Sequence, residues 1–169
     1  MNKINSLEEL FIDQLRDLYS VEVQLVEALA KMSETATSPE LKTAFVDHLN
    51  GTVDHLNRLE EIFKSHDASP RGKPCAAMEG LVHECRDLIR EGAHPGVLDA
   101  GLIAIAQKAE HYEIAGYGTA RAYASILGDA RAEATLQATL DEEKEMDRKL
   151  TELAGSFVNE EANQVTASS

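Results

Sequence analysis

Ionisable residues interrupt four apolar stripes in this 169-residue chain. Each stripe repeats every three or four residues, which is the spacing of one face of an α-helix. A buried ionisable group is costly unless it is neutralised, paired or bound to a counter-ion. Such groups, brought to the same depth by four helices, predict a metal site inside a helical bundle. The residues concerned are Glu22 in the first stripe, His48 and His55 in the second, Glu110 and Glu113 in the third, and Glu143 and Asp147 in the fourth.

The residue types suit a particular coordination chemistry. Carboxylates are hard anionic ligands that can bridge two cations, and imidazole adds a neutral nitrogen ligand that suits iron or manganese. Residues three or four apart lie on one helix face, so the two acidic pairs of the third and fourth stripes are predicted to chelate. We therefore predict a site for two iron or manganese ions, with the ligands Glu22, His55, Glu110, Glu113, Glu143 and Asp147.

Some of these residues also have structural interpretations. If the assigned inward face of the first helix were wrong by one residue, Glu22 would lie on the helix surface. His55 could equally be a metal ligand or a core residue that forms a hydrogen bond. His48 is predicted to be a core or interface histidine that forms a hydrogen bond. Glu142 is predicted to belong to a solvated face. Tyr117 is predicted to pack in the core with its hydroxyl group paired.

Five helical segments are predicted to position these residues, and no strand pattern competes with them. Ser6 and Glu9 form a capping-box pattern, and Ser38 followed by Pro39 suits the start of a second helix. The chain is predicted to be one all-α domain over 1–157, with a polar tail over 158–169 that lacks regular structure. The predicted helices cover 7–32, 39–65, 76–91, 97–127 and 130–156, of which the third is short.

A matched spacing suggests two helix hairpins. Glu22 and His55 are 33 residues apart, and so are Glu110 and Glu143. Two hairpins packed back to back would bring the ionisable positions of all four long helices together.

The charge and the cysteine content limit the class of protein. The formal net charge of −14 disfavours nucleic acid and anionic membrane surfaces as partners, because binding to either needs clustered basic residues. No segment approaches the ~18 apolar residues of a membrane span, and the first residues do not resemble a signal peptide. Two cysteines are too few for a disulfide framework. A cytoplasmic protein with two free thiols is expected.

Four segments of the chain resemble the YciF/YciE family of bacterial stress-associated, ferritin-like proteins. They are FIDQLRDLYSVEVQL, CAAMEGLVHE, AQKAEHYEIAGYGT and LDEEKEMDRKLTELA, and the similarity covers about residues 7–153. The resemblance implies a ferritin-like four-helix bundle with an additional short helix between the second and third long helices. It also implies a homodimer and a site for two metal ions. Glu22, Glu110, Glu113 and Glu143 match acidic positions of such proteins, whereas Asp147 stands where rubrerythrin-like proteins have a histidine.

The second helix departs from the family pattern. Family members commonly have HLEET where this chain has HLNGT, over His48 to Thr52. Asn50 or Gly51 therefore replaces a glutamate, and a bridging carboxylate is expected to be missing. A glycine inside a helix also costs about 1 kcal/mol relative to alanine and permits a local bend.

Two functions of different class follow from these observations. The first is an oxidoreductase in which two iron or manganese ions react with oxygen or peroxide. The second is a non-enzymatic stress protein that acts as a scaffold or metal buffer, with its polar groups closed into a hydrogen-bond network. The acidic pairs of the third and fourth helices favour the first function, and the missing glutamate favours the second.

Overall fold

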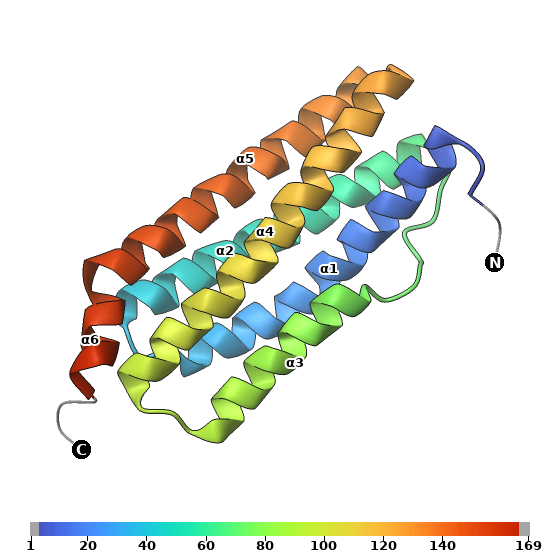
Figure 1. Ribbon diagram of the computed structural model, residues 1–169. Helices are drawn as coiled ribbons and strands as arrows, with labels where there is room; N and C mark the ends of the chain where they lie inside the picture. Colours follow the sequence, from blue (N-terminus) through green and yellow to red (C-terminus); the bar gives the residue numbers. More distant parts are fainter. Residues whose placement is uncertain (1–3, 166–169) are drawn as a thin grey trace.

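The computed structural model describes residues 4–165. Four long helices lie side by side, and a shorter helix packs at one end of the bundle (Figure 1). The described residues contain no strand, so the predicted all-α class is confirmed. The elements are α1 Leu7–Thr35, α2 Pro39–Ser65, α3 Ala76–Glu91, α4 Pro95–Leu127, α5 Ala130–Leu153, a π-helical turn η1 Ala154–Val158, and α6 Asn159–Gln164.

The long helices form two hairpins. Helix α1 packs along α2, and α4 packs along α5, as the equal spacing of the ionisable residues predicts. The two hairpins meet mainly through α1 with α4 and α2 with α5, and α3 lies against α1 and α4. The short helix between the second and third long helices is therefore present where it was predicted.

Side chains fix where the helices begin and end. Ser6 and Glu9 form the predicted capping box at the start of α1, and the Ser38 hydroxyl accepts a hydrogen bond from the Leu41 N–H at the start of α2. Helix α4 ends at Gly128, whose φ of 77° suits glycine because it lacks a Cβ atom. These local signals explain why the predicted bounds agree closely with the structure.

The C-terminal segment differs from the prediction. The chain remains helical as far as Gln164, so the unstructured tail predicted from Val158 onward is wrong for this part. Val158 is buried in the core, and α6 packs against α4. Phe157 also packs against the core, and the polar residues that follow Val158 in the sequence hide this anchor. Residues 166–169 of the predicted tail lie outside the described part of the chain.

The apolar core is divided into two clusters by the polar site. One cluster gathers α3 and the adjoining halves of α1, α2 and α4, and it includes Leu25, Phe45 and Ala109. The other lies toward the opposite end of the bundle and includes Leu18 and Leu59. The ionisable residues lie in sequence between members of the two clusters on every long helix. The bundle therefore buries them at one common level.

Within residues 4–165, no helix is both long enough and apolar enough to cross a membrane.

Candidate metal centre

Two groups of buried ligand atoms meet between the four long helices, and Glu143 belongs to both. In each group, one ligand atom from every member lies within 4.8 Å of one from each other member. Each hairpin contributes ligands from its inner face. Residues that lie one or two helical turns apart point from the same face, so they reach the same site. The first group is His48, Glu110, Glu113 and Glu143, and the second is Glu22, His55 and Glu143.

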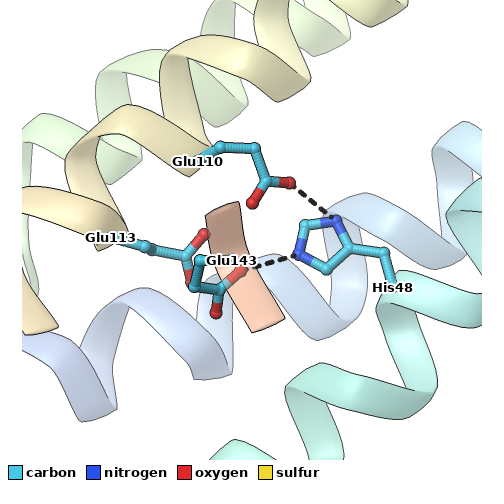
Figure 2. A group of neighbouring side chains, drawn as sticks. All are labelled: His48, Glu110, Glu113 and Glu143. Carbon is cyan, nitrogen blue, oxygen red and sulfur yellow. Dashed lines mark ion pairs between the residues drawn. The ribbon is translucent and has the colours of Figure 1, made fainter. Parts of the chain in front are cut away.

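The first group joins α2, α4 and α5 (Figure 2). The Nδ1 atom of His48 lies 3.1 Å from Oε1 of Glu110, and its Nε2 atom lies 3.8 Å from Oε2 of Glu143. Figure 2 shows the two carboxylates of α4 on the same side of the site, facing the imidazole ring from α2. This arrangement gives a metal ion one nitrogen and several oxygen atoms.

The second group joins α1, α2 and α5. The Nδ1 atom of His55 lies 2.9 Å from Oε1 of Glu143 and 3.3 Å from Oε1 of Glu22. The hydroxyl group of Tyr117, which is fully buried on α4, donates a hydrogen bond to Glu22. Tyr117 thus has the paired hydroxyl group that was predicted, and it fixes the Glu22 carboxylate.

A half-exposed contact links the second group to the surface. The Nε2 atom of His55 lies 2.9 Å from Oε2 of Glu142, and Arg58 donates two hydrogen bonds to the same carboxylate, at 2.8 and 2.9 Å. The pKa of Glu142 is lowered, chiefly by Arg58. Glu142 was predicted to be solvated, and its side chain is 47% exposed, but it also orients the His55 ring.

Many buried polar atoms at the site lack a hydrogen-bond partner. They include both oxygens of Glu110, both oxygens of Glu113 and both ring nitrogens of His48. Unpaired buried polar groups cost about 1–3 kcal/mol each. These atoms are therefore available to hold a metal ion.

Burial and mutual repulsion raise the pKa values of three of the four buried glutamates. Burial raises the pKa of Glu110 and of Glu113 well above 4.5, and Glu143 adds to both shifts. Burial also raises the pKa of Glu22 to about 7, although His55 opposes the shift. Burial acts on Glu143 in the same direction, but His55 outweighs it, so the pKa of Glu143 falls below its ordinary value. The site thus takes up protons when no metal ion is bound.

The two histidines differ in charge. Burial lowers the pKa of His48 to about 4, so its ring is neutral at pH 7 and its nitrogen lone pair is free to bind a metal ion. Burial opposes charge on His55 too, but the carboxylates of Glu143 and Glu22 outweigh it and raise its pKa to about 10. His55 therefore pairs as a cation with Glu143 in the metal-free protein.

Asp147 lies apart from both groups. Its Oδ1 atom accepts a hydrogen bond of 3.1 Å from Gln107 and lies 3.7 Å from Nδ1 of His111. Its charge still contributes to the raised pKa of Glu110. Because its side chain is 24% exposed, Asp147 occupies the edge of the bundle one turn beyond Glu143. The other five predicted ligands are brought together.

The unusual sequence of α2 does not interrupt that helix, which is continuous through Gly51. Asn50 is exposed. A Cβ atom at Gly51 would lie 3.9 Å from Cε1 and Nε2 of His55, so position 51 borders the outer side of that ring. A glutamate there would approach the side of His55 that Glu142 contacts in this chain. Thr52 occupies the neighbouring buried position.

The donor set suits two divalent transition-metal ions. The four buried glutamates carry four negative charges when ionised, which two divalent cations balance, while two neutral imidazoles supply nitrogen atoms. The unpaired oxygens of Glu110 and Glu113 are the atoms that such ions would satisfy. The residues present therefore fit a dinuclear centre.

Sequence reasoning missed the place of His48 in this group. It was predicted to form a hydrogen bond, yet neither of its ring nitrogens has a hydrogen-bond partner, and both lie near carboxylates. The available signal was its position on the same stripe as His55, two turns earlier. No sequence pattern indicated the contact of Glu142 with His55. Glu142 lies at a half-exposed position outside the apolar stripe, and its carboxylate reaches inward to the His55 ring.

Comparisons with known proteins agree with the fold. Residues 6–163 match the family described as a domain of unknown function, DUF892. The chain is 42% identical over 160 residues to Protein YciF of Escherichia coli (strain K12), covering 94% of this chain and 96% of the relative. The matched range extends beyond residue 157, in agreement with the helical C-terminal segment.

Two solved structures are also similar. The crystal structure of the E. coli stress protein YciF has a TM-score of 0.88 and 42% identity, covering 92% of this chain and 99% of that chain. YcfI from Rhodopseudomonas palustris, proposed to be a structural protein, has a TM-score of 0.85 and 40% identity, covering 89% of this chain and 96% of that chain. The chain therefore belongs to the YciF family of stress-associated helical-bundle proteins.

Proposed function

We propose that this protein binds two iron or manganese ions at the buried site and that the ions react with dioxygen or peroxide. The observation that carries the proposal is the sharing of Glu143 between two groups of buried ligand atoms. A carboxylate in that position can bridge two cations. The proposed ligands are Glu22, His48, His55, Glu110, Glu113 and Glu143.

When bound, the ions would supply one-electron redox chemistry, and the residues around them would control charge. The His48 ring is already neutral at pH 7, whereas His55 must lose a proton before its Nδ1 atom can bind a cation. The Glu142 carboxylate lies beside Nε2 of His55, so it can accept a hydrogen bond from that nitrogen and keep Nδ1 facing Glu22 and Glu143. Tyr117 keeps the Glu22 carboxylate oriented during exchange of protons for metal ions.

Metal stoichiometry tests the proposal. Metal-free protein is titrated with Co²⁺, whose visible spectrum reports its ligands, and iron and manganese loading is then measured by elemental analysis. Two ions per chain are expected, and Glu143→Ala should reduce both sites because it belongs to both groups. Glu145→Ala is the matched control, because this residue on the same helix is exposed and pairs with Arg148. Loading well below one ion per chain in the unaltered protein would refute the proposal.

A structural role is the second candidate. The His55 ion pairs with Glu143 and Glu22 partly close the network without metal. The similar protein YcfI is itself proposed to be structural. The same titration separates the two functions, because a purely structural network binds no Co²⁺ and its melting temperature does not respond to the ion.

The assembly and the location stay predictions. The family resemblance predicts a homodimer, which sedimentation at equilibrium would test. Cys75 and Cys85 are free and buried, and two free thiols favour the cytoplasm.

A further inference from the structure

An apolar cavity adjoins the metal centre on the side of His48. It lies between α1, α3 and α4, and its walls include Leu25 from α1, Met78 from α3 and Ile105 and Ala109 from α4. His48 is the one lining residue with a charged or hydrogen-bonding nitrogen or oxygen in its side chain. The cavity therefore ends at a proposed metal ligand.

The size and the lining of this cavity limit which molecules can occupy it. Its free volume is about 10 Å³, which is near the lower limit for one molecule of the size of water. Water needs two to four polar partners to occupy such a site, and apolar cavities stay dry but take up xenon or small apolar molecules. Hydrogen peroxide has the same need for hydrogen bonds as water, whereas dioxygen has none.

The cavity shares part of its lining with a groove on the surface. A groove of about 370 Å³ runs between α1 and α3, and Ala28, Val82 and Cys85 line both this groove and the cavity. The burial that encloses Cys85 raises the pKa of its thiol, so it stays neutral and the wall stays apolar. An exposed ion pair, Arg86 with Glu27 at 3.0 Å, stands at the outer edge of the groove. Rotation of the Val82 and Cys85 side chains would join the groove to the cavity.

We propose that the cavity binds dioxygen from the α1–α3 groove and delivers it to the His48 side of the metal centre. The delivery rests on the proposed function, but the affinity of the cavity for a small apolar gas does not. Peroxide would instead approach past Glu142 and Arg58, whose half-exposed polar groups face solvent on α5 and α2. The inference thus names dioxygen as the substrate that this face serves.

Xenon tests the cavity without any metal. Crystals of the metal-free protein under xenon pressure should hold one atom beside His48. Ala28→Phe should prevent xenon from binding, because the phenylalanine ring would fill the cavity. Ala30→Phe is the matched control, since Ala30 lines the groove but not the cavity. Cys85→Ala removes a sulfur atom from the lining, so it enlarges the cavity and should raise the xenon occupancy. Absence of xenon from both the unaltered protein and Cys85→Ala would overturn the proposal.

Oxidation of bound ferrous iron tests the delivery. Two ferrous ions each give one electron, and dioxygen with two protons becomes hydrogen peroxide. Ala28→Phe should slow this reaction about tenfold at limiting dioxygen, equivalent to about 1.4 kcal/mol. Co²⁺ binding, and oxidation of the iron by added peroxide, should be unchanged in Ala28→Phe and in Ala30→Phe.

The outcomes separate this inference from the proposed function. If no variant binds Co²⁺, the proposed function fails, and the delivery of dioxygen that rests on it is overturned as well. If Co²⁺ binds but Ala28→Phe oxidises at the unaltered rate with dioxygen, the delivery alone is overturned. Equal slowing with dioxygen and with peroxide would also overturn it, because a blocked apolar passage should affect only dioxygen.

Discussion

Replacing Glu113 by glutamine is expected to stabilise the metal-free protein at neutral pH. Burial and the neighbouring Glu143, Glu22 and Glu110 raise the pKa of Glu113 well above 4.5, so the folded protein favours its protonated form. A carboxyl group that stays protonated in the folded protein costs about 1.4 kcal/mol for each unit by which the pH exceeds its ordinary pKa. Glutamine has a similar shape and avoids this cost.

The gain at pH 7 is expected to be at most about 3 kcal/mol, or roughly 10 °C in melting temperature for a domain of this size. At pH 4.5 the unfolded carboxyl group is itself half protonated, so the gain should fall below about 1 kcal/mol. The same substitution should weaken Co²⁺ binding, because an amide oxygen carries no charge. Stability and metal affinity therefore change in opposite directions.

Asp99→Asn is the matched control for this experiment. Asp99 is also buried, but its oxygens accept three hydrogen bonds of 2.8 Å, from the Thr37 N–H, the Thr37 hydroxyl and the Ser38 N–H. Hydrogen bonds to a charged group contribute about 1.5–3 kcal/mol, so this substitution should destabilise the protein and leave Co²⁺ binding unchanged. Thermal and urea unfolding of both variants at pH 4.5 and 7 would decide. A Glu113→Gln protein that is less stable than the unaltered protein at pH 7, or a gain that does not change with pH, would refute the reasoning.

Three further predictions concern the same bundle. Gly51→Ala should stabilise α2 by about 1 kcal/mol in thermal unfolding, since the added Cβ meets His55 only at 3.9 Å; a loss of stability would mean that the position is tighter. Asp147→Ala should keep the metal stoichiometry found by elemental analysis, because Asp147 lies outside both ligand groups; a lost ion would make it a ligand. The unfolding free energy of the metal-free protein should fall as pH rises from 7 to 10. The raised pKa of His55 gives stability that is full below 6.5 and lost through about 10, whereas the lowered pKa of His48 acts in the opposite direction only below 6.5. Stability that rises from pH 7 to 10 would contradict the His55 shift.

The helices of this fold are well predicted because their signals are local. The Ser6 capping box and the Ser38–Pro39 start each depend on residues within one turn, and the structure has both. The inward faces follow from periodicity alone, which is why Glu22, Glu110 and Glu143 are all buried as expected. Such information needs no knowledge of the neighbouring helix.

The partners of the inward residues are harder to predict, because they depend on how far side chains reach across the bundle. His48 and His55 share one stripe, yet His48 contacts Glu110 of α4, and His55 contacts Glu22 of α1. Glu143 and Asp147 are one turn apart, and only Glu143 lies deep enough to serve both groups. A helical pattern predicts the direction in which a side chain points from the helix axis. It does not predict how far a long side chain reaches into the bundle.

Protons and the proposed metal ions would compete for the same atoms at this site, and that competition would account for its composition. Four buried carboxylates cannot all remain charged in an apolar core, so the metal-free protein must protonate some of them and pair Glu143 with cationic His55. Two divalent cations would balance the same four charges and would release those protons. A set of residues that served only stability would not leave the oxygens of Glu110 and Glu113 unpaired, since apolar side chains of similar size would cost less. The unpaired oxygens of these two residues are therefore better explained by metal binding than by folding.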